Sequence, residues 1–118
     1  MNYTMLVGRV TRDLILRNIE SGNDVVNFTI AVTRNYKNKD GEYDTDFINC
    51  VAWNKIASTA CDYIKKGDLI GIKGSLQTKN MTTADGTKYT ATELLAEKIT
   101  FLDMSKTIDY SNEKKIRI

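Results

Sequence analysis

Apolar and polar residues alternate along five stretches of the chain, which is the pattern of half-buried β-strands. The clearest alternation sets Val26, Phe28, Ile30 and Val32 against the polar Asn27, Thr29 and Thr33. The expected strands span residues 3–10, 24–35, 43–53, 69–80 and 88–102. Polar loops with Asp-Gly pairs follow the second and fourth of them, as in hairpin turns.

One helix is expected between the third and fourth strands. Asn54 suits its amino-terminal cap, Lys65 and Lys66 suit its carboxyl end, and Gly67 suits its termination. Three strands, a helix and two further strands is the order of a five-stranded oligonucleotide-binding barrel, an all-β fold with one helix. A sandwich would need more strands, and a doubly wound fold would need more helices.

The third strand carries the first indication of function. Strand alternation puts Ile48, Cys50 and Ala52 on one small apolar face, and Phe47, Asn49, Val51 and Trp53 on the other. Two large rings on a face of mixed polarity, in a strand that already has a core face, suggest a platform for stacking nucleobases. Packing of both rings inside the barrel end is the competing interpretation.

Composition narrows the function classes. The 118 residues suit one domain, and the chain has no histidine, which removes His-dependent catalytic triads and the commonest metal ligand. No glycine-rich phosphate loop is present, so we expect neither an enzyme nor a bound cofactor or metal. Net charge is +2, but four basic and two acidic residues fall in residues 105–118, which leaves 13 of each sign in residues 1–104. Attraction of a polyanion by the body must therefore come from clustered charge.

The cysteines and the hydropathy pattern indicate the cellular compartment in which the protein is expected. Cys50 falls in an expected strand and Cys61 in the expected helix, outside any close-spaced metal pattern. Two reduced, buried thiols in a cytoplasmic protein are expected, with a disulfide as the disfavoured alternative. No apolar run is long enough to span a bilayer, and the amino terminus does not read as a signal peptide.

Residues 3–103 resemble bacterial and bacteriophage single-stranded DNA-binding proteins. The resemblance is carried, in order, by Leu6-Val7-Gly8-Arg9-Val10-Thr11-Arg12-Asp13, Val26-Asn27-Phe28-Thr29-Ile30-Ala31-Val32, Asp46-Phe47-Ile48-Asn49-Cys50-Val51-Ala52-Trp53-Asn54, Tyr63-Ile64-Lys65-Lys66-Gly67-Asp68 and Gly71-Ile72-Lys73-Gly74-Ser75-Leu76-Gln77-Thr78. It implies an oligonucleotide-binding barrel that binds single-stranded DNA without sequence preference during replication, recombination and repair. It also implies a homo-oligomer, usually a tetramer, paired partly through residues 3–7; the sequence leaves dimer and tetramer open.

The resemblance assigns stacking positions singly. Tyr36 stands where the family has a ring after the second strand, and Phe47 and Trp53 match two rings of the third strand. Met81 stands where members often carry Trp or Tyr, and this departure predicts a weaker contact because a thioether lacks a π-face. Tyr89, beside Lys88, is a further stacking candidate.

Phosphate contacts require cations near the rings. The candidates interleave with the aromatic residues or share a strand face with them: Arg9, Arg12, Arg34, Lys37, Lys39, Lys55, Lys73, Lys79 and Lys88. As single residues, most of these would be ordinary solvated surface. Lys73 and Lys79 share strand parity and are expected to border the same groove.

A barrel at 1–104 and a short basic tail at 105–118, expected to be flexible, complete the predicted organisation. The tail departs from the acidic tail with which cellular relatives dock partner enzymes, so recruitment of replication or recombination proteins by that route is not expected. A phage or mobile-element origin, acting in the host cytoplasm, is compatible with this departure. A primosome-like protein-interaction module and an RNA chaperone of cold-shock type are the alternatives; comparison of deoxythymidine and uridine oligomers separates DNA from RNA preference.

Overall fold

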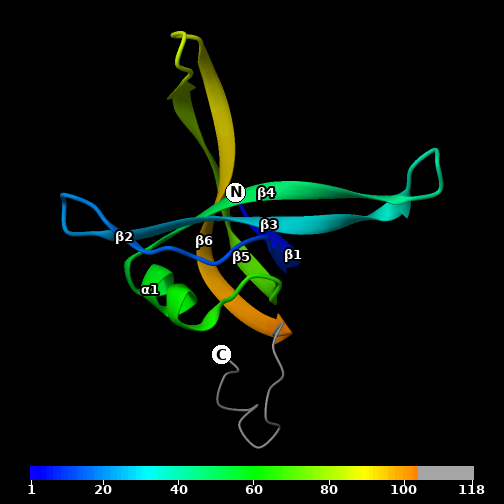
Figure 1. The fold of residues 1–118 in the computed structure, drawn as a ribbon, viewed down its shortest axis with the longest axis horizontal. Coiled ribbons are helices and arrows are strands. Elements are labelled where there is room, and N and C mark those ends of the chain that lie inside the picture. The colour runs from blue at the N-terminus through cyan, green and yellow to red at the C-terminus, as the bar shows by residue number, and fades with distance from the viewer. Residues whose placement is uncertain (104–118) are drawn as a thin grey trace, which may run out of the picture.

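The computed structural model describes residues 1–103, so the predicted tail lies outside the described residues. The chain forms β1 (Thr4–Val10), β2 (Arg17–Asn18), β3 (Asp24–Lys37), β4 (Tyr43–Trp53), α1 (Asn54–Tyr63), β5 (Leu69–Thr82) and β6 (Lys88–Asp103). The sheet order is β1-β5-β6-β4-β3-β2, and β1 also pairs with β3. This last pairing closes five long strands into a barrel, which confirms the expected oligonucleotide-binding fold (Figure 1).

Closure brings β1 unusually near to β3. β1 pairs with β5 along most of its length and reaches β3 only at Arg9 and Val10. Gly8 comes just before this contact, and an added Cβ there would lie 2.7 Å from the carbonyl oxygen of Ala31. Glycine is therefore required by the close approach of two backbones.

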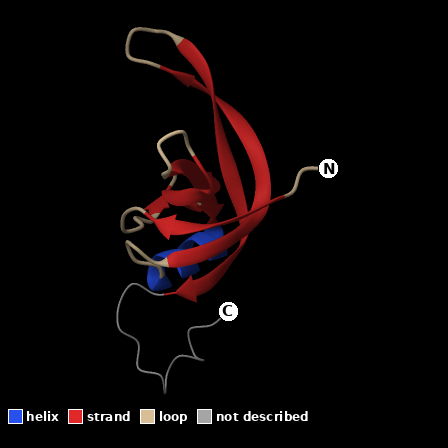
Figure 2. Ribbon diagram, turned by 90° about the vertical axis from the view of Figure 1, so that its right-hand side faces the viewer, coloured by secondary structure: helices blue, strands red, loops and turns tan. Residues whose placement is uncertain are grey.

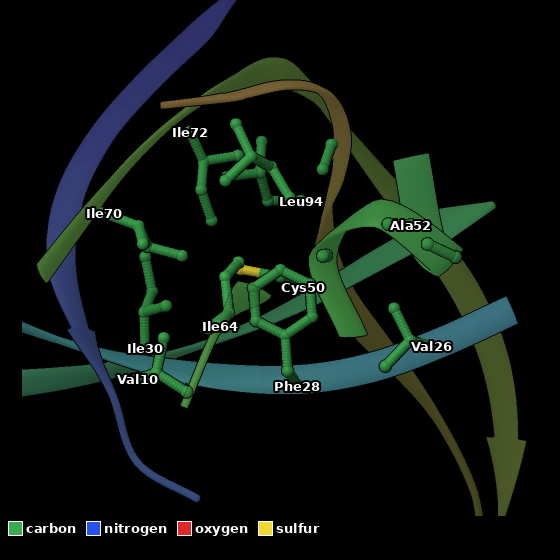
Figure 3. Close-up of a cluster of buried hydrophobic side chains, with 14 of the residues drawn as sticks. Val10, Val26, Phe28, Ile30, Cys50, Ala52, Ile64, Ile70, Ile72 and Leu94 are labelled. Carbon is green, nitrogen blue, oxygen red and sulfur yellow. The ribbon is translucent and has the colours of Figure 1, made fainter. Parts of the chain in front are cut away.

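The barrel interior is filled by the apolar alternation that the sequence predicts. Phe28 and Ile30 of β3 point inward with Cys50 of β4, Ile72 of β5 and Leu94 of β6, all of them buried (Figure 3). Helix α1 contributes Ala57 and Ala60 to the same core. These side chains come from β3, β4, β5, β6 and α1. Their packing therefore fixes the positions of the strands whose outer faces form the protein surface.

Two hairpins extend beyond this core. We call residues 33–45 the β3–β4 arm and residues 77–92 the β5–β6 arm. Figure 1 shows them leaving the barrel in different directions, and Figure 2 shows the curvature of β5 and β6, whose hairpin is at the top of both views. No residue in either range is fully buried. The arms are therefore surface elements whose side chains are available for contacts.

The helix departs from its predicted limits. It ends at Tyr63, and Trp53 occupies the cap position without a side-chain capping bond, so the prediction of Asn54 as cap and Gly67 as terminator was wrong. Asn54 instead has a φ of 52°, and its Oδ1 accepts a hydrogen bond from the Asp24 amide. Gly67 donates its amide to Val10, which draws the segment after the helix onto the barrel. Among the described residues, no helix has the length and apolar character needed to cross a membrane.

Candidate nucleic-acid interface

The outer side of β4 carries the predicted rings. Alternation along β4 puts Tyr43, Phe47 and Trp53 on one side, and all three are exposed. We call this side of β4, together with the residues of β1, β2 and β3 that flank it, the platform. Val51 lies on the same side but is buried, which differs from the mixed exposed face that we expected. It lies where β6 joins β4, with Leu95 paired opposite, so closure of the barrel accounts for its burial.

Cross-strand register places a cation in the same row as each of the two predicted rings of β4, with one residue of β3 between them. Phe47 lies opposite Ala31, and Ala31 lies opposite Arg9. Residues directly opposite each other in paired strands share a face, so Arg9 and Phe47 flank Ala31 on the platform. The Arg9 guanidinium also donates to the Gly67 carbonyl oxygen at 2.9 Å.

A second row repeats this arrangement. Trp53 lies opposite Val25, and Val25 lies opposite Arg17. The Arg17 guanidinium donates to Oδ1 of Asn27 at 3.0 Å, which holds it over the platform. Sequence reasoning missed Arg17, because only the pairing of the two-residue strand β2 with β3 brings it near Trp53.

A hollow of about 290 Å³ lies between the β5–β6 arm and the barrel segments of β3 and β4. Four of the predicted site residues line it: Arg12, Lys79, Met81 and Tyr89. Met81 and Tyr89 lie directly opposite each other on β5 and β6, so the two predicted contacts form one wall. Asn27, Asn49 and Glu93 also line the hollow and were not predicted.

The unpredicted polar residues give the hollow hydrogen-bonding groups. Oδ1 of Asn27 accepts from Arg17, and Oδ1 of Asn49 lies 3.2 Å from the Thr29 hydroxyl. These contacts orient both amides and leave their NH₂ groups as donors toward a ligand. The sequence did contain a sign of Asn27 and Asn49, because both are polar residues at platform-side positions of β3 and β4.

Glu93 is a buried carboxylate in a site that otherwise favours anions. It is 8% exposed, accepts a hydrogen bond from Gln77 at 3.0 Å, and lies 3.8 Å from Nζ of Lys79. Burial, with a contribution from the negative charge of Glu93, raises the pKa of the Cys50 thiol to about 12. Lys79 is thus partly neutralised from within the hollow.

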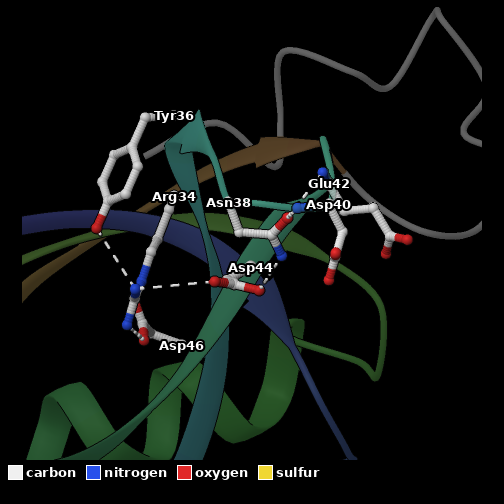
Figure 4. Close-up of polar contacts among 7 residues, drawn as sticks. All are labelled: Arg34, Tyr36, Asn38, Asp40, Glu42, Asp44 and Asp46. Atoms are coloured by element: carbon white, nitrogen blue, oxygen red, sulfur yellow. Dashed lines mark hydrogen bonds and ion pairs between the residues drawn. The ribbon is translucent and has the colours of Figure 1, made fainter.

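Arg34 and Tyr36 lie together on the β3–β4 arm (Figure 4). Nε and Nη2 of Arg34 each donate to Asp46 at 2.9 Å, and Nη1 lies 3.4 Å from the Tyr36 hydroxyl. The hydrogen bonds with Asp46 raise the pKa of Arg34 above its usual value, and they lower the pKa of Asp46. Because Asp46 and Phe47 are neighbours in a strand, this group occupies the face opposite Phe47.

The remaining predicted cations fall in separate places. Lys37 lies over the Tyr43 ring, and Lys88 borders a hollow with Met81 and Tyr89. Lys39 is exposed in the turn of the β3–β4 arm.

Two other predicted cations border different hollows. Lys55 faces β6 from the start of α1. Lys73 lies 5.2 Å from the ring of Tyr3, beside β1, and not with Lys79 as expected. A register shift between Lys73 and Gly74 separates the two lysines, so strand parity is not a guide across it.

The described residues contain no group of three or more His, Cys, Asp or Glu side chains arranged to hold a metal ion. The same residues form an oligonucleotide-binding barrel. One side of this barrel carries exposed rings, a cation in the row of each of two rings, and a polar hollow. The chain matches the single-strand binding protein family over residues 1–102, and it belongs to that family.

Individual relatives agree with this membership. Single-stranded DNA-binding proteins of Bacillus cereus and Bacillus anthracis are each 48% identical to the chain over 103 residues, 87% of its length. The chain covers 61% and 60% of those two proteins. A single-stranded DNA-binding protein of Staphylococcus aureus is 43% identical over 109 residues, which are 92% of this chain and 70% of that protein. The chain therefore spans about three-fifths of the length of the Bacillus relatives.

Proposed function

We propose that this protein binds single-stranded DNA without strong sequence preference and protects it during replication, recombination and repair. The observation that carries the proposal is that an exposed ring and a cation share a cross-strand row at two places on the platform. Phe47 shares a row with Arg9, and Trp53 shares one with Arg17. Stacking accepts every base and cations accept every phosphate, so neither contact depends on sequence.

The hollow beside the β5–β6 arm extends this surface. Met81 and Tyr89 supply a second wall for bases, with Arg12, Lys79 and Lys88 near them for phosphates. Lys37 and Lys39 serve the same role on the other arm. Tyr36 is proposed as a ring contact on the far face of that arm, and Arg34, Lys55 and Lys73 are the members of the predicted set whose surroundings support a phosphate contact least.

We also propose a homo-oligomer, with a tetramer favoured over a dimer. Tyr3, just before β1, and Met5 and Val7 of β1 are exposed side chains, and they border a hollow of about 460 Å³ with Leu102 of β6. Contiguous apolar surface of this kind is typical of an interface. Light scattering of the purified protein measures the assembly, and a monomeric mass would contradict it. A DNA-binding role places the protein in the cytoplasm, which is the host's for a phage protein.

Titration with single-stranded oligodeoxythymidine tests the proposed function. Trp53 is the sole tryptophan, so its fluorescence reports binding at the platform. We expect strong quenching that weakens as salt rises, with a log–log slope of about −0.7 for each phosphate neutralised. A parallel titration with oligouridine separates DNA from RNA preference. Absence of both quenching and a gel shift at low salt would contradict the proposal.

A further inference from the structure

Where the β5–β6 arm joins the barrel, one wall of the 290 Å³ hollow carries a negative charge. Strand alternation on β6 puts Tyr89, Ala91 and Glu93 on one face, and all three line the hollow. Glu93 is 8% exposed, so its carboxylate is held within the wall and does not extend into solvent. Because a carboxylate repels phosphate, its place in this wall favours recognition of another part of a nucleotide.

Glu93 has acceptor capacity left after its contacts within the protein. Oε1 accepts a hydrogen bond from Nε2 of Gln77 at 3.0 Å, which orients the carboxylate. Oε2 lies 3.8 Å from Nζ of Lys79, beyond hydrogen-bond distance. A carboxylate offers about four lone-pair sites, so Oε2 can accept from a donor that enters the hollow.

An amide donor lies beside this acceptor. The parallel contact of β4 and β6 pairs Cys50 with Leu94. The residues that precede them, Asn49 and Glu93, therefore share a row on strands about 5 Å apart. Oδ1 of Asn49 accepts from the Thr29 hydroxyl at 3.2 Å, which directs the NH₂ group of Asn49 toward a ligand as a donor. The hollow thus presents an acceptor and a donor side by side.

The hollow has room for a nucleobase over these groups. Its volume of about 290 Å³ is about ten times the share of liquid volume that one water takes. Met81 and Tyr89 form a wall against which a flat base can stack. The small side chain of Ala91 leaves space between this wall and Glu93. A base held there turns one edge toward the carboxylate and the amide.

The bases differ in what they present to this pair of groups. Cytosine and adenine each carry an amino group beside a ring nitrogen, which supplies one donor and one acceptor on the same edge. Thymine and uracil carry a carbonyl oxygen in place of the amino group, and a carboxylate repels that oxygen. An acceptor next to a donor therefore distinguishes the amino bases from the other two.

We propose that the hollow is a base-edge subsite, in which Glu93 accepts a hydrogen bond from the exocyclic amino group of cytosine or adenine while Asn49 donates to the adjacent ring nitrogen. The inference rests on the proposed function and adds a local base preference to it. Stacking on Phe47 and Trp53 remains indifferent to the base, so the preference is confined to the nucleotide in the hollow.

Oligodeoxycytidine and oligodeoxyuridine of equal length give a matched comparison, because their bases differ only at ring positions 3 and 4. The quantity measured is the ratio of the two affinities at one salt concentration. Glu93→Gln keeps the volume of the side chain, but its amide both donates and accepts and so serves either base. We expect this variant to lower the preference for oligodeoxycytidine by about fivefold for each hollow occupied, the lower end of base-edge discrimination.

Two further variants locate the preference. Ala91→Ile fills the hollow between Tyr89 and Glu93 without changing any charge, and it should lower the same ratio. Phe47→Ala removes a ring of the platform, so it should weaken binding of both oligomers by the same factor and leave the ratio as it is in the parent.

The outcomes separate the inference from the function beneath it. A parent-like ratio in Glu93→Gln or in Ala91→Ile would overturn the inference while the proposed function stands. An equal fall of the ratio in Phe47→Ala would also overturn it, because the discrimination would then come from the platform. Failure of the parent protein to bind either oligomer would overturn both.

Discussion

Replacement of Phe47 by alanine separates a binding ring from a structural one. Phe47 is 66% exposed, so about one third of its surface is already covered in the unbound protein. An aromatic side chain offers about 150–250 Å², so roughly 50–80 Å² is buried, worth about 1–2 kcal/mol of folding stability. Small domains have about 5–15 kcal/mol of stability, so the variant should remain folded.

We expect Phe47→Ala to weaken DNA binding while the protein stays almost entirely folded. Loss of one stacked base costs about 1–3 kcal/mol, which weakens binding about 5- to 150-fold at each site that uses the ring. Trp53 is retained in Phe47→Ala, so its fluorescence still reports the titration. No charge is removed, and the salt slope of the variant should therefore equal that of the parent.

A matched control comes from Phe28, which is 2% exposed and lies in the core. Phe28→Ala should lower stability by about 3–5 kcal/mol, with binding lost only as the protein unfolds. The reasoning would be refuted if Phe47→Ala bound within about twofold of the parent. It would also be refuted if Phe47→Ala unfolded as readily as Phe28→Ala.

Three further outcomes are expected. Glu93→Gln should tighten DNA binding by about 2- to 30-fold, for a phosphate roughly 8 Å away, and raise the salt slope because Lys79 is released; unchanged or weaker binding would contradict this. Asn54→Ala should lower the urea-measured free energy of unfolding by about 1–2 kcal/mol more than Asn54→Gly, since glycine accepts the positive φ; equal losses would count against backbone strain. The folded pKa of Cys50, about 12, exceeds the roughly 8.5 of an unfolded thiol, so the folded state keeps its proton longer. Stability should fall between pH 9 and 12 by up to about 1.4 kcal/mol per pH unit, and Cys50→Ala should lack this part of the slope; identical slopes would refute it.

Local patterns were enough to predict the barrel and two of its rings. Alternation within one strand determines that Phe47 and Trp53 share a face, and that information lies within eleven consecutive residues. Asn54 shows where local rules failed, because its side chain binds the distant Asp24 amide instead of capping the helix.

The hydrophobic pattern within single strands could not predict which residues lie opposite each other in neighbouring strands. The rows that join Arg9 to Phe47 and Arg17 to Trp53 depend on register between strands far apart in the chain. Tyr36 lies within the register shift between Thr33 and Lys37, which no single-strand pattern reveals. These nonlocal features explain why Arg17 was missed, although it is an ordinary exposed residue of its strand.

Neither described arm contains a buried residue. Substitutions on the arms should therefore change ligand affinity more than they change the free energy of unfolding. Barrel amides such as those of Ile30 and Ile72 should exchange hydrogen with solvent only through global unfolding. Amides near the arm tips should exchange through local openings that leave the barrel intact. Substitutions on the arms can therefore retune ligand affinity with little thermodynamic consequence for the fold, which makes the arms the part of the molecule most open to adaptive change.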